Sequence, residues 1–340
     1  MRQKIQTNFL LNIGSRIALR PKVNDSLVSG LGTVDSILPI GRGQRQLILG
    51  DRYTGKTSIF LVVLRHANRM NSIGSIDGLG TRRLIALYIG INQNLSKLAS
   101  TISGIMIDRY CLILAAHAPS SSSSAFLSPL IGVSIGERLR DRGLDCCICS
   151  DDPSKHSKSY RQTSSISGKT PSRDASPADI PNIHPPVPER RGRLKYSSGG
   201  GSITALPITE TINPDITEHI ATNVIPITDG QFHSNRKLFL ESIRPAVDPA
   251  LSASRIGTNA QAKLMKVYSV GAKNLITHYR NVLEDSEADH YGYDTLNRIF
   301  YQDHPQVFPL ETTIILLLCY RTDSAKNISA NAKAHVSIIP

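Results

Sequence analysis

Residues 50–58 read GDRYTGKTS, a glycine, four variable residues, a second glycine, a lysine and a threonine, which is the pattern of a phosphate-binding loop. Backbone N–H groups at a helix N-terminus bind polyphosphate, and glycines at both ends of the loop keep side chains away from them. The lysine can reach the β- and γ-phosphates, and the threonine hydroxyl can coordinate Mg²⁺. The predicted nucleotide-binding residues are Gly50, Asp51, Arg52, Tyr53, Thr54, Gly55, Lys56, Thr57 and Ser58.

A magnesium site needs a second element, a carboxylate at the end of a neighbouring strand that holds the water shell of the ion. The apolar run at 146–149 is followed by Asp151 and Asp152. We expect Asp151 to contact Mg²⁺ through water, together with Thr57. Taken alone, the two acids could simply end a strand.

The loop requires a strand before it and a helix after it, and the apolar runs 46–49 and 59–64 fit these roles. Unbroken apolar runs predict further buried strands at 84–91, 110–116 and 146–150. Helical spacing predicts helices at 95–107 and 131–142, with a serine-rich loop at 120–124 between them. Strands separated by helices indicate an α/β fold with a mostly parallel sheet covered on both faces.

The second half of the chain changes character. Residues 155–198 are rich in proline and serine, and we expect little regular structure there. Residues 202–210 and 223–228 are β-rich, and helical spacing returns beyond 260 at Leu264, Val267, Val270, Leu275 and Tyr279. The predicted organisation is a basic connector (1–24), a nucleotide-binding domain (25–257) containing the irregular segment 155–198, a small helical domain (258–321) and a tail (322–340).

Composition restricts the class of protein without identifying it. The 340 residues are 40% hydrophobic and carry a formal charge of +12, which suits a globular protein with an anionic partner. The five cysteines lack the spacing of a zinc site, so we interpret them as structural thiols in a reducing compartment. Residues 1–24 are basic without any acidic residue, which is typical of either a transit peptide or a connector.

Several motifs occur in one order along the chain: residues 39–45, GDRYTGKTS, SDDPSK, GGGSITALPITET, TNVIPITDGQ, IRPAVDPALSASRIG and residues 260–266. Together they resemble the alpha subunits of the F-type rotary ATP synthases. The resemblance implies a RecA-like domain in a ring with catalytic beta subunits, around a central gamma stalk and beside a peripheral stalk. It also implies that the alpha site binds Mg-ATP without turning it over, and no nucleic-acid partner is expected.

The resemblance assigns roles to three further residues. Gln93 stands where a catalytic subunit needs a carboxylate to orient water, and an amide cannot accept that proton. Arg255, in the motif SRIG, is implied to reach the phosphate bound by a neighbouring beta subunit, in trans. Gln302 matches one of two glutamines of the adenine pocket, whereas His304 replaces the second.

The chain also departs from the family pattern. Tyr53 replaces a glutamine of the loop, Asn94 and Leu95 replace a Lys–Arg pair, and the amino-terminal β-barrel of the family is not matched, which favours a connector at 1–24. The prolines at 185, 186 and 188 would break a helix that the family forms. The family has Leu at the positions of Pro153, Ser165, Ser167 and Pro188, and Met at the position of Thr163. Such replacements arise either when a gene is translated without cytidine-to-uridine editing of its transcript or by ordinary drift.

Two other functions remain open from the residues. A hexameric RNA translocase would share the RecA-like core and suit the basic charge, but it would need a catalytic Glu near Gln93 and an aromatic strand-binding module. The second alternative is a truncated paralogue that no longer assembles into a complex. For the leading interpretation we expect the matrix side of the mitochondrial inner membrane, with the chloroplast thylakoid or a bacterial plasma membrane as alternatives.

Overall fold

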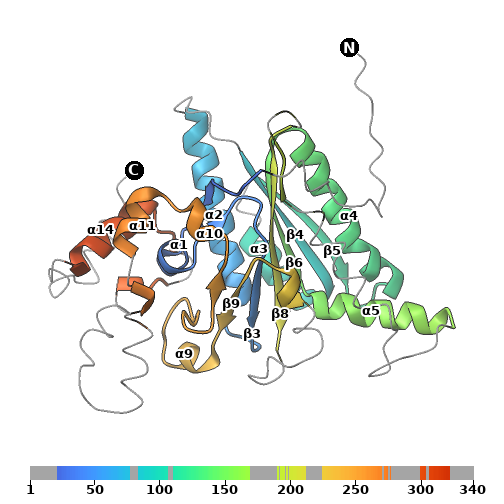
Figure 1. Ribbon diagram of the computed structural model, residues 1–340. Coiled ribbons are helices and arrows are strands. Elements are labelled where there is room, and N and C mark those ends of the chain that lie inside the picture. The colour runs from blue at the N-terminus through green and yellow to red at the C-terminus, as the bar shows by residue number, and fades with distance from the viewer. Residues whose placement is uncertain are drawn as a thin grey trace.

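The computed structural model describes residues 21–76, 83–105, 110–168, 190, 192–195, 197, 199–211, 224–269, 272–274, 276, 299–303 and 306–321. Their centre is an eight-stranded sheet of order β10-β9-β3-β8-β6-β4-β5, with β7 paired to β8 (Figure 1). Strands β7 and β10 are antiparallel to their neighbours, whereas the other six run parallel. The strands are β3 (Gln46–Gly50), β4 (Leu84–Gln93), β5 (Cys111–His117), β6 (Asp145–Asp151), β7 (Gly192–Arg193), β8 (Ser202–Glu210), β9 (Gly230–Ser234) and β10 (Ala253–Ser254).

Helices cover both faces of the sheet because neighbouring residues of each buried strand point to opposite sides. Tyr88 of β4 packs in the same core as Phe60 of α2 (Lys56–Ile76), which α3 (Leu95–Ile105) and α1 (Gly32–Ile37) complete. Leu87, one residue earlier, packs in a second core with Val133 of α4 (Ser122–Asp141), and α5 (Pro153–Ile166) packs against α4. The predicted α/β fold with a mostly parallel, doubly covered sheet is confirmed.

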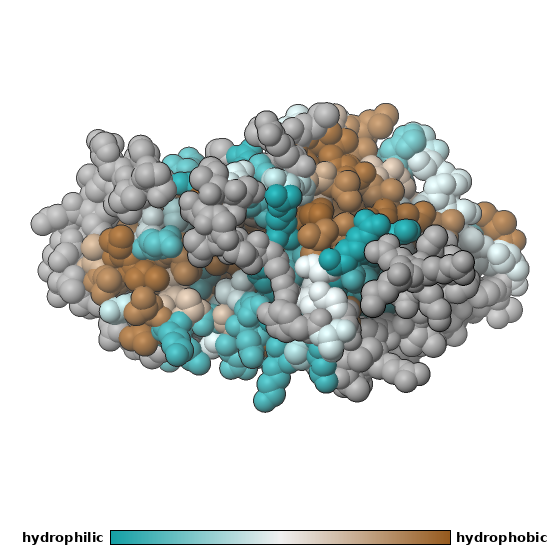
Figure 2. All heavy atoms as spheres, turned by 90° about the horizontal axis from the view of Figure 1, so that it is seen from above, coloured by the Kyte–Doolittle hydropathy of each residue, from teal (hydrophilic) through white to brown (hydrophobic). Residues whose placement is uncertain are grey.

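Strand β5 corrects one expectation, because it was predicted to be buried and lies at the edge of the sheet. Among the strands that are described it pairs with β4 alone, and its side chains Leu112 and Ile113 are 44% and 36% exposed. In Figure 2, viewed from above, apolar atoms gather on the side where Figure 1 places α4 and β5. An apolar run predicts a strand, but its place in the sheet depends on pairing that the run does not encode.

Three local predictions of secondary structure between residues 120 and 228 were wrong. The serine run predicted as a loop begins α4, with the Ser121 hydroxyl accepting a hydrogen bond from the Ser124 N–H (3.2 Å). The start of the segment predicted as irregular lies in α5, whose buried residues are four serines and His156, so that the helix lacks an apolar period. The segment 223–228, predicted as β-rich, contains the 3₁₀ turn η4 (Ile225–Ile227).

Helix α5 shows why its proline does not prevent helix formation. Asp152 caps it, accepting a hydrogen bond from the Ser154 N–H (2.7 Å), and Pro153 takes a first-turn position, where its missing N–H costs nothing. Most of the rest of the segment, including residues 169–189 with prolines 185, 186 and 188, lies outside the described residues. That the transcript of this chain is edited stays a prediction. Peptide mass spectrometry of the native chain would test it, because Pro and Ser found at the replaced positions would refute editing.

A small helical group packs beside α1. It comprises α10 (Gly257–Ala260), α11 (Lys263–Ser269) and α14 (Leu310–Arg321), and its core contains Met265, Phe300 and Leu317. The helical face predicted from Leu264, Val267, Val270, Leu275 and Tyr279 was wrong at the two positions that can be compared, because Leu264 and Val267 are exposed. Residues 270, 275 and 279 and the tail 322–340 lie outside the described residues. Among the helices that are described, none has the length and apolar character needed to cross a membrane.

The short elements complete the fold. The chain enters through a two-stranded sheet of β1 (Ser26–Leu27) and β2 (Ile40–Gly41), and β9 leads into α9 (Arg236–Leu240). The six parallel strands all end on the same side of the sheet, as parallel strands must. The loop after β3 and the residues that end β4, β6 and β8 therefore meet at one edge.

Candidate nucleotide-binding site

The loop between β3 and α2 has a backbone that requires its glycines. Gly50 and Gly55 have φ angles of 152° and 82°, a region that glycine adopts without steric cost. A Cβ at Gly50 would lie 2.4 Å from the carbonyl oxygen of Ser234. At Gly55 the nearest atom would be 3.9 Å away, on Phe239. Gly50 is therefore required both because there is no room for a Cβ and because of its φ angle. Gly55 is required because of its φ angle alone.

Lys56 is buried and bends back over the loop. Its ammonium donates hydrogen bonds to the carbonyl oxygens of Gly50 (2.8 Å) and Asp51, and burial lowers its pKa. The Asp51 carbonyl also accepts a hydrogen bond from the Thr54 hydroxyl (2.8 Å). Tyr53, with φ of 63°, is 90% exposed. The Lys56 ammonium thus lies against the backbone of the phosphate-binding loop, where this motif places its lysine.

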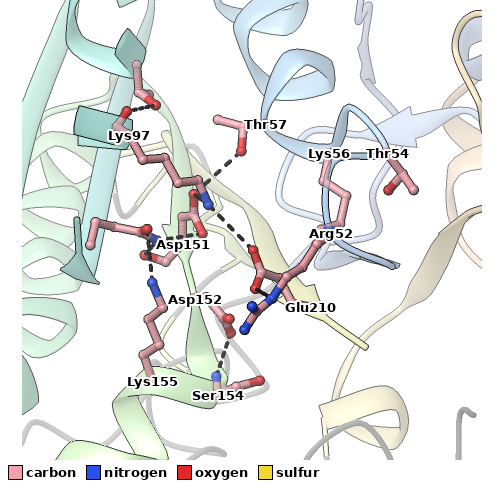
Figure 3. Close-up of polar contacts among 12 residues, drawn as sticks. Arg52, Thr54, Lys56, Thr57, Lys97, Asp151, Asp152, Ser154, Lys155 and Glu210 are labelled. Carbon is pink, nitrogen blue, oxygen red and sulfur yellow. Dashed lines mark hydrogen bonds and ion pairs between the residues drawn. The ribbon is translucent and has the colours of Figure 1, made fainter. Parts of the chain in front are cut away.

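Three strand ends supply the other side of the site (Figure 3). Asp151 of β6 is fully buried; its Oδ2 accepts a hydrogen bond from the Tyr88 hydroxyl (3.1 Å) and lies 3.5 Å from the Thr57 hydroxyl. Its Oδ1 accepts from the Gln93 amide (2.8 Å). Burial and the Asp151 charge raise the pKa of Tyr88, so the tyrosine stays a donor. Thr57 and Asp151, predicted as partners, lie together.

Gln93, at the end of β4, is held by both ends of its amide. Its nitrogen also donates to the Asp151 carbonyl oxygen (3.0 Å), and its oxygen accepts from the Lys155 ammonium (3.0 Å). Burial lowers the pKa of Lys155. The end of β4 therefore presents a fixed amide, which cannot remove a proton from water.

The oxygen donors Thr57 and Asp151 fit a magnesium ion in type and position. The described residues contain no group of three or more His, Cys, Asp or Glu that could hold a metal, so a magnesium ion here would depend on phosphate oxygens as well. Thr57 would bind it directly and Asp151 through water. Such an ion neutralises phosphate charge.

Arg255 lies apart from this cluster, directly after β10, at the edge of the sheet, with β9, β3 and β8 between β10 and β6. Its N–H donates to the Asp229 carbonyl oxygen (3.0 Å), and Arg45 holds Asp229 through two side-chain hydrogen bonds (3.0 and 2.7 Å). The Arg255 side chain is exposed and, within the described part of the chain, has no hydrogen bond or ion pair. Arg255 is therefore not part of the cluster around Asp151.

Gln302 has a structural role in this conformation. Its amide nitrogen donates to the carbonyl oxygens of Gly30 (2.6 Å) and Gln306 (2.8 Å), and its amide oxygen accepts from the Gly32 N–H (3.2 Å). Its backbone N–H donates to Arg244 (2.9 Å), which lines a pocket with Thr33, Leu238, Ile243, Pro245, Val247, Pro249, Ile276 and Phe300. The structure therefore places Gln302 beside a pocket with its side chain engaged elsewhere, and His304 lies outside the described residues.

Sequence reasoning missed the charged residues that complete the site. Glu210 ends β8 and pairs with Arg52 (3.1 Å), and Lys97 in the first turn of α3 contacts both Asp151 and Glu210. Glu210 could have been found, because it is an acid at the end of the predicted β-rich segment 202–210. No sequence motif marked Lys97, because the direction of its side chain depends on how α3 packs against the sheet. Ser58, half-buried in α2, has no side-chain hydrogen bond among the described residues.

Comparison with known proteins identifies the family. Residues 30–254 match the ATP synthase alpha/beta family, nucleotide-binding domain. Similar proteins named ATP synthase subunit alpha come from Trypanosoma brucei brucei (mitochondrial; 40% identity over 79% of this chain and 46% of the relative), Neurospora crassa (mitochondrial; 37%, 82% and 51%) and Anaplasma phagocytophilum (39%, 79% and 53%). The chain spans about half the length of these relatives. With its phosphate loop, parallel sheet and matching sequence, this chain belongs to the ATP synthase alpha/beta family.

Proposed function

We propose that this chain binds Mg-ATP as a non-catalytic alpha subunit of an ATP synthase head. The observation that carries this proposal is Gln93, whose amide is fixed between Asp151 and Lys155, at the position to which the family resemblance assigns the orientation of water. An amide has no basic lone pair for a proton, so the bound nucleotide would persist as a structural or regulatory ligand.

The proposed contribution to turnover is Arg255, given in trans to an adjacent beta subunit. Its backbone is held by the Asp229–Arg45 pair, whereas its guanidinium is exposed. A guanidinium delivered across an interface stabilises charge on the transferred phosphoryl group. The same proposal includes the gamma stalk and peripheral-stalk subunits as partners and the matrix side of the mitochondrial inner membrane as location. The names of two relatives support the mitochondrion.

The first test measures nucleotide binding and turnover by the isolated chain. Equilibrium binding of a fluorescent ATP analogue should be detectable with Mg²⁺, without ATP hydrolysis. Lys56→Gln should weaken binding by about 10²-fold, because a charge-assisted contact to phosphate is lost. Hydrolysis by the isolated chain would contradict the non-catalytic assignment.

The second test mixes the chain with beta and gamma subunits and measures ATP hydrolysis by the complex. Arg255→Ala should lower turnover by roughly 10³-fold while leaving ATP binding by the isolated chain unchanged. Arg255→Lys, which keeps the charge but loses the planar fork, should remain impaired. Failure to form any complex with beta subunits would contradict the subunit assignment.

A further inference from the structure

Lys97 brings a positive charge into the site from a helix that carries no sequence motif. Its ammonium lies 3.4 Å from Asp151 Oδ2 and 3.6 Å from Glu210 Oε1, and the side chain is 41% exposed. A cation in the first turn of a helix faces the positive end of the helix dipole. The two carboxylates, rather than α3 itself, therefore account for its position, and Figure 3 shows it between them.

The oxygen that Lys97 contacts is also the one nearest the predicted magnesium ligand. Asp151 Oδ2 lies 3.5 Å from the Thr57 hydroxyl, so this oxygen would face both the ammonium and the water shell of a magnesium ion. An ammonium and a magnesium ion that face the same oxygen repel each other. The protein therefore already holds one positive charge beside the carboxylate that would face the ion.

The cations of the site balance its carboxylates in number, so the placement of Lys97 matters more than the total charge. Four cationic side chains lie around the site, Arg52, Lys56, Lys97 and Lys155, against the four carboxylates of Asp51, Asp151, Asp152 and Glu210. Burial acts to raise the pKa of Glu210, but Lys97, then Lys56, Arg52 and Lys155, lower it overall. Arg52 and Lys97 both contact this carboxylate, at 3.1 and 3.6 Å, and Lys97 also contacts Asp151.

We propose that Lys97 supplies part of the charge that Mg²⁺ provides in a phosphate loop, so that nucleoside triphosphate binding by this chain depends only weakly on Mg²⁺. The long, partly exposed side chain can turn from the two carboxylates to phosphate oxygens. The inference rests on the proposed nucleotide-binding function, and the experiment below separates the two.

The test is the ratio of two dissociation constants for ATP, measured on the full chain by isothermal titration calorimetry with excess EDTA and with Mg²⁺. For the native chain we expect a ratio below about threefold, because the ammonium compensates for the missing ion. Lys97→Gln should raise the ratio to about tenfold or more, since it removes one unit charge beside the phosphates. Lys97→Arg keeps the charge and should keep the low ratio.

Lys158→Gln is the matched control, because this lysine is exposed on α5 and its loss changes the net charge by the same amount. It should leave the ratio unchanged. Native binding that requires Mg²⁺, or a ratio in Lys97→Gln equal to the native one, would overturn the role of Lys97 and leave nucleotide binding intact. Absence of ATP binding in both buffers would overturn the proposed function and this inference with it. The native ratio is informative even if the variants do not fold.

Discussion

The two sides of the nucleotide site are built in different ways. The loop side comes from one contiguous segment, residues 50–58, and depends on backbone conformation at Gly50 and Gly55. The carboxylate side is assembled from β4, β6, β8 and α3 and depends on charged side chains around Asp151. A steric rule therefore governs the loop, whereas an electrostatic balance governs the carboxylates.

This difference predicts how each side fails. A side chain added at Gly50 meets backbone atoms of Ser234 that cannot move without shifting β9, so the cost is immediate and local. A charge removed from the carboxylate side leaves its former partners buried and unpaired, and this cost is shared among several residues. Substitutions on the two sides should separate these mechanisms.

The largest effect is expected from Gly50→Ala. Its Cβ would lie 2.4 Å from the Ser234 carbonyl oxygen and its φ of 152° is unfavourable for alanine, so the free energy of unfolding should fall by about 3 kcal/mol or more. Gly55→Ala is the matched control, with free space but φ of 82°, and should cost about 1–2 kcal/mol. Urea unfolding measures both, and equal losses would refute the steric explanation.

The second prediction concerns pH and the support of the carboxylate side. His156 of α5 donates from Nε2 to the Phe126 carbonyl oxygen of α4 (3.0 Å) and stacks on its ring, and burial lowers its pKa to about 4. Between pH 6.5 and 4 the unfolded chain binds a proton that the folded chain does not. The contribution of His156 to the free energy of unfolding should therefore fall as pH falls through this range, by up to about 3 kcal/mol.

His156→Gln isolates this contribution, because glutamine keeps a donor for Phe126 and does not titrate. The native chain should lose stability relative to the variant on acidification, as measured by chemical unfolding at several pH values. A constant difference between the two proteins from pH 7 to pH 4 would show that His156 is protonated equally in both states.

Asp151→Asn tests the electrostatic side directly. The substitution keeps the shape but removes the charge that Tyr88, Thr57 and Lys97 face, and we expect a loss of about 2 kcal/mol in the free energy of unfolding. Asp25→Asn is the control, because Asp25 forms an ion pair with Arg193 while half exposed, and should cost under about 1 kcal/mol. Similar losses in both would argue against a special role for the buried carboxylate.

The smallest effect is expected from Tyr53→Gly in the loop. Tyr53 has φ of 63° and an almost fully exposed ring, so glycine removes backbone strain but adds freedom to the unfolded chain. The two nearly offset, and the net gain in stability should stay within about 1 kcal/mol. A thermal-unfolding loss larger than this would reveal a ring contact that stabilises the loop.

Much of the site could be predicted from short segments. The loop is contiguous, so Gly50, Lys56 and Thr57 are recognisable from spacing alone, and Asp151 follows a strand that is visible as an apolar run. The structure confirms the strands β3, β4, β6 and β8 and brings Thr57 and Asp151 together. Local patterns succeed here because each residue acts within its own element.

The sequence by itself determined the α/β class, the phosphate loop and the amide at Gln93, because these follow from residue type and period along the chain. Only the tertiary structure decided that β5 lies at the sheet edge, that a serine-faced segment forms α5, and that Lys97 lies between Asp151 and Glu210. Strand order, helix packing and charge pairing join residues far apart in the chain, and no local pattern specifies which of them will meet.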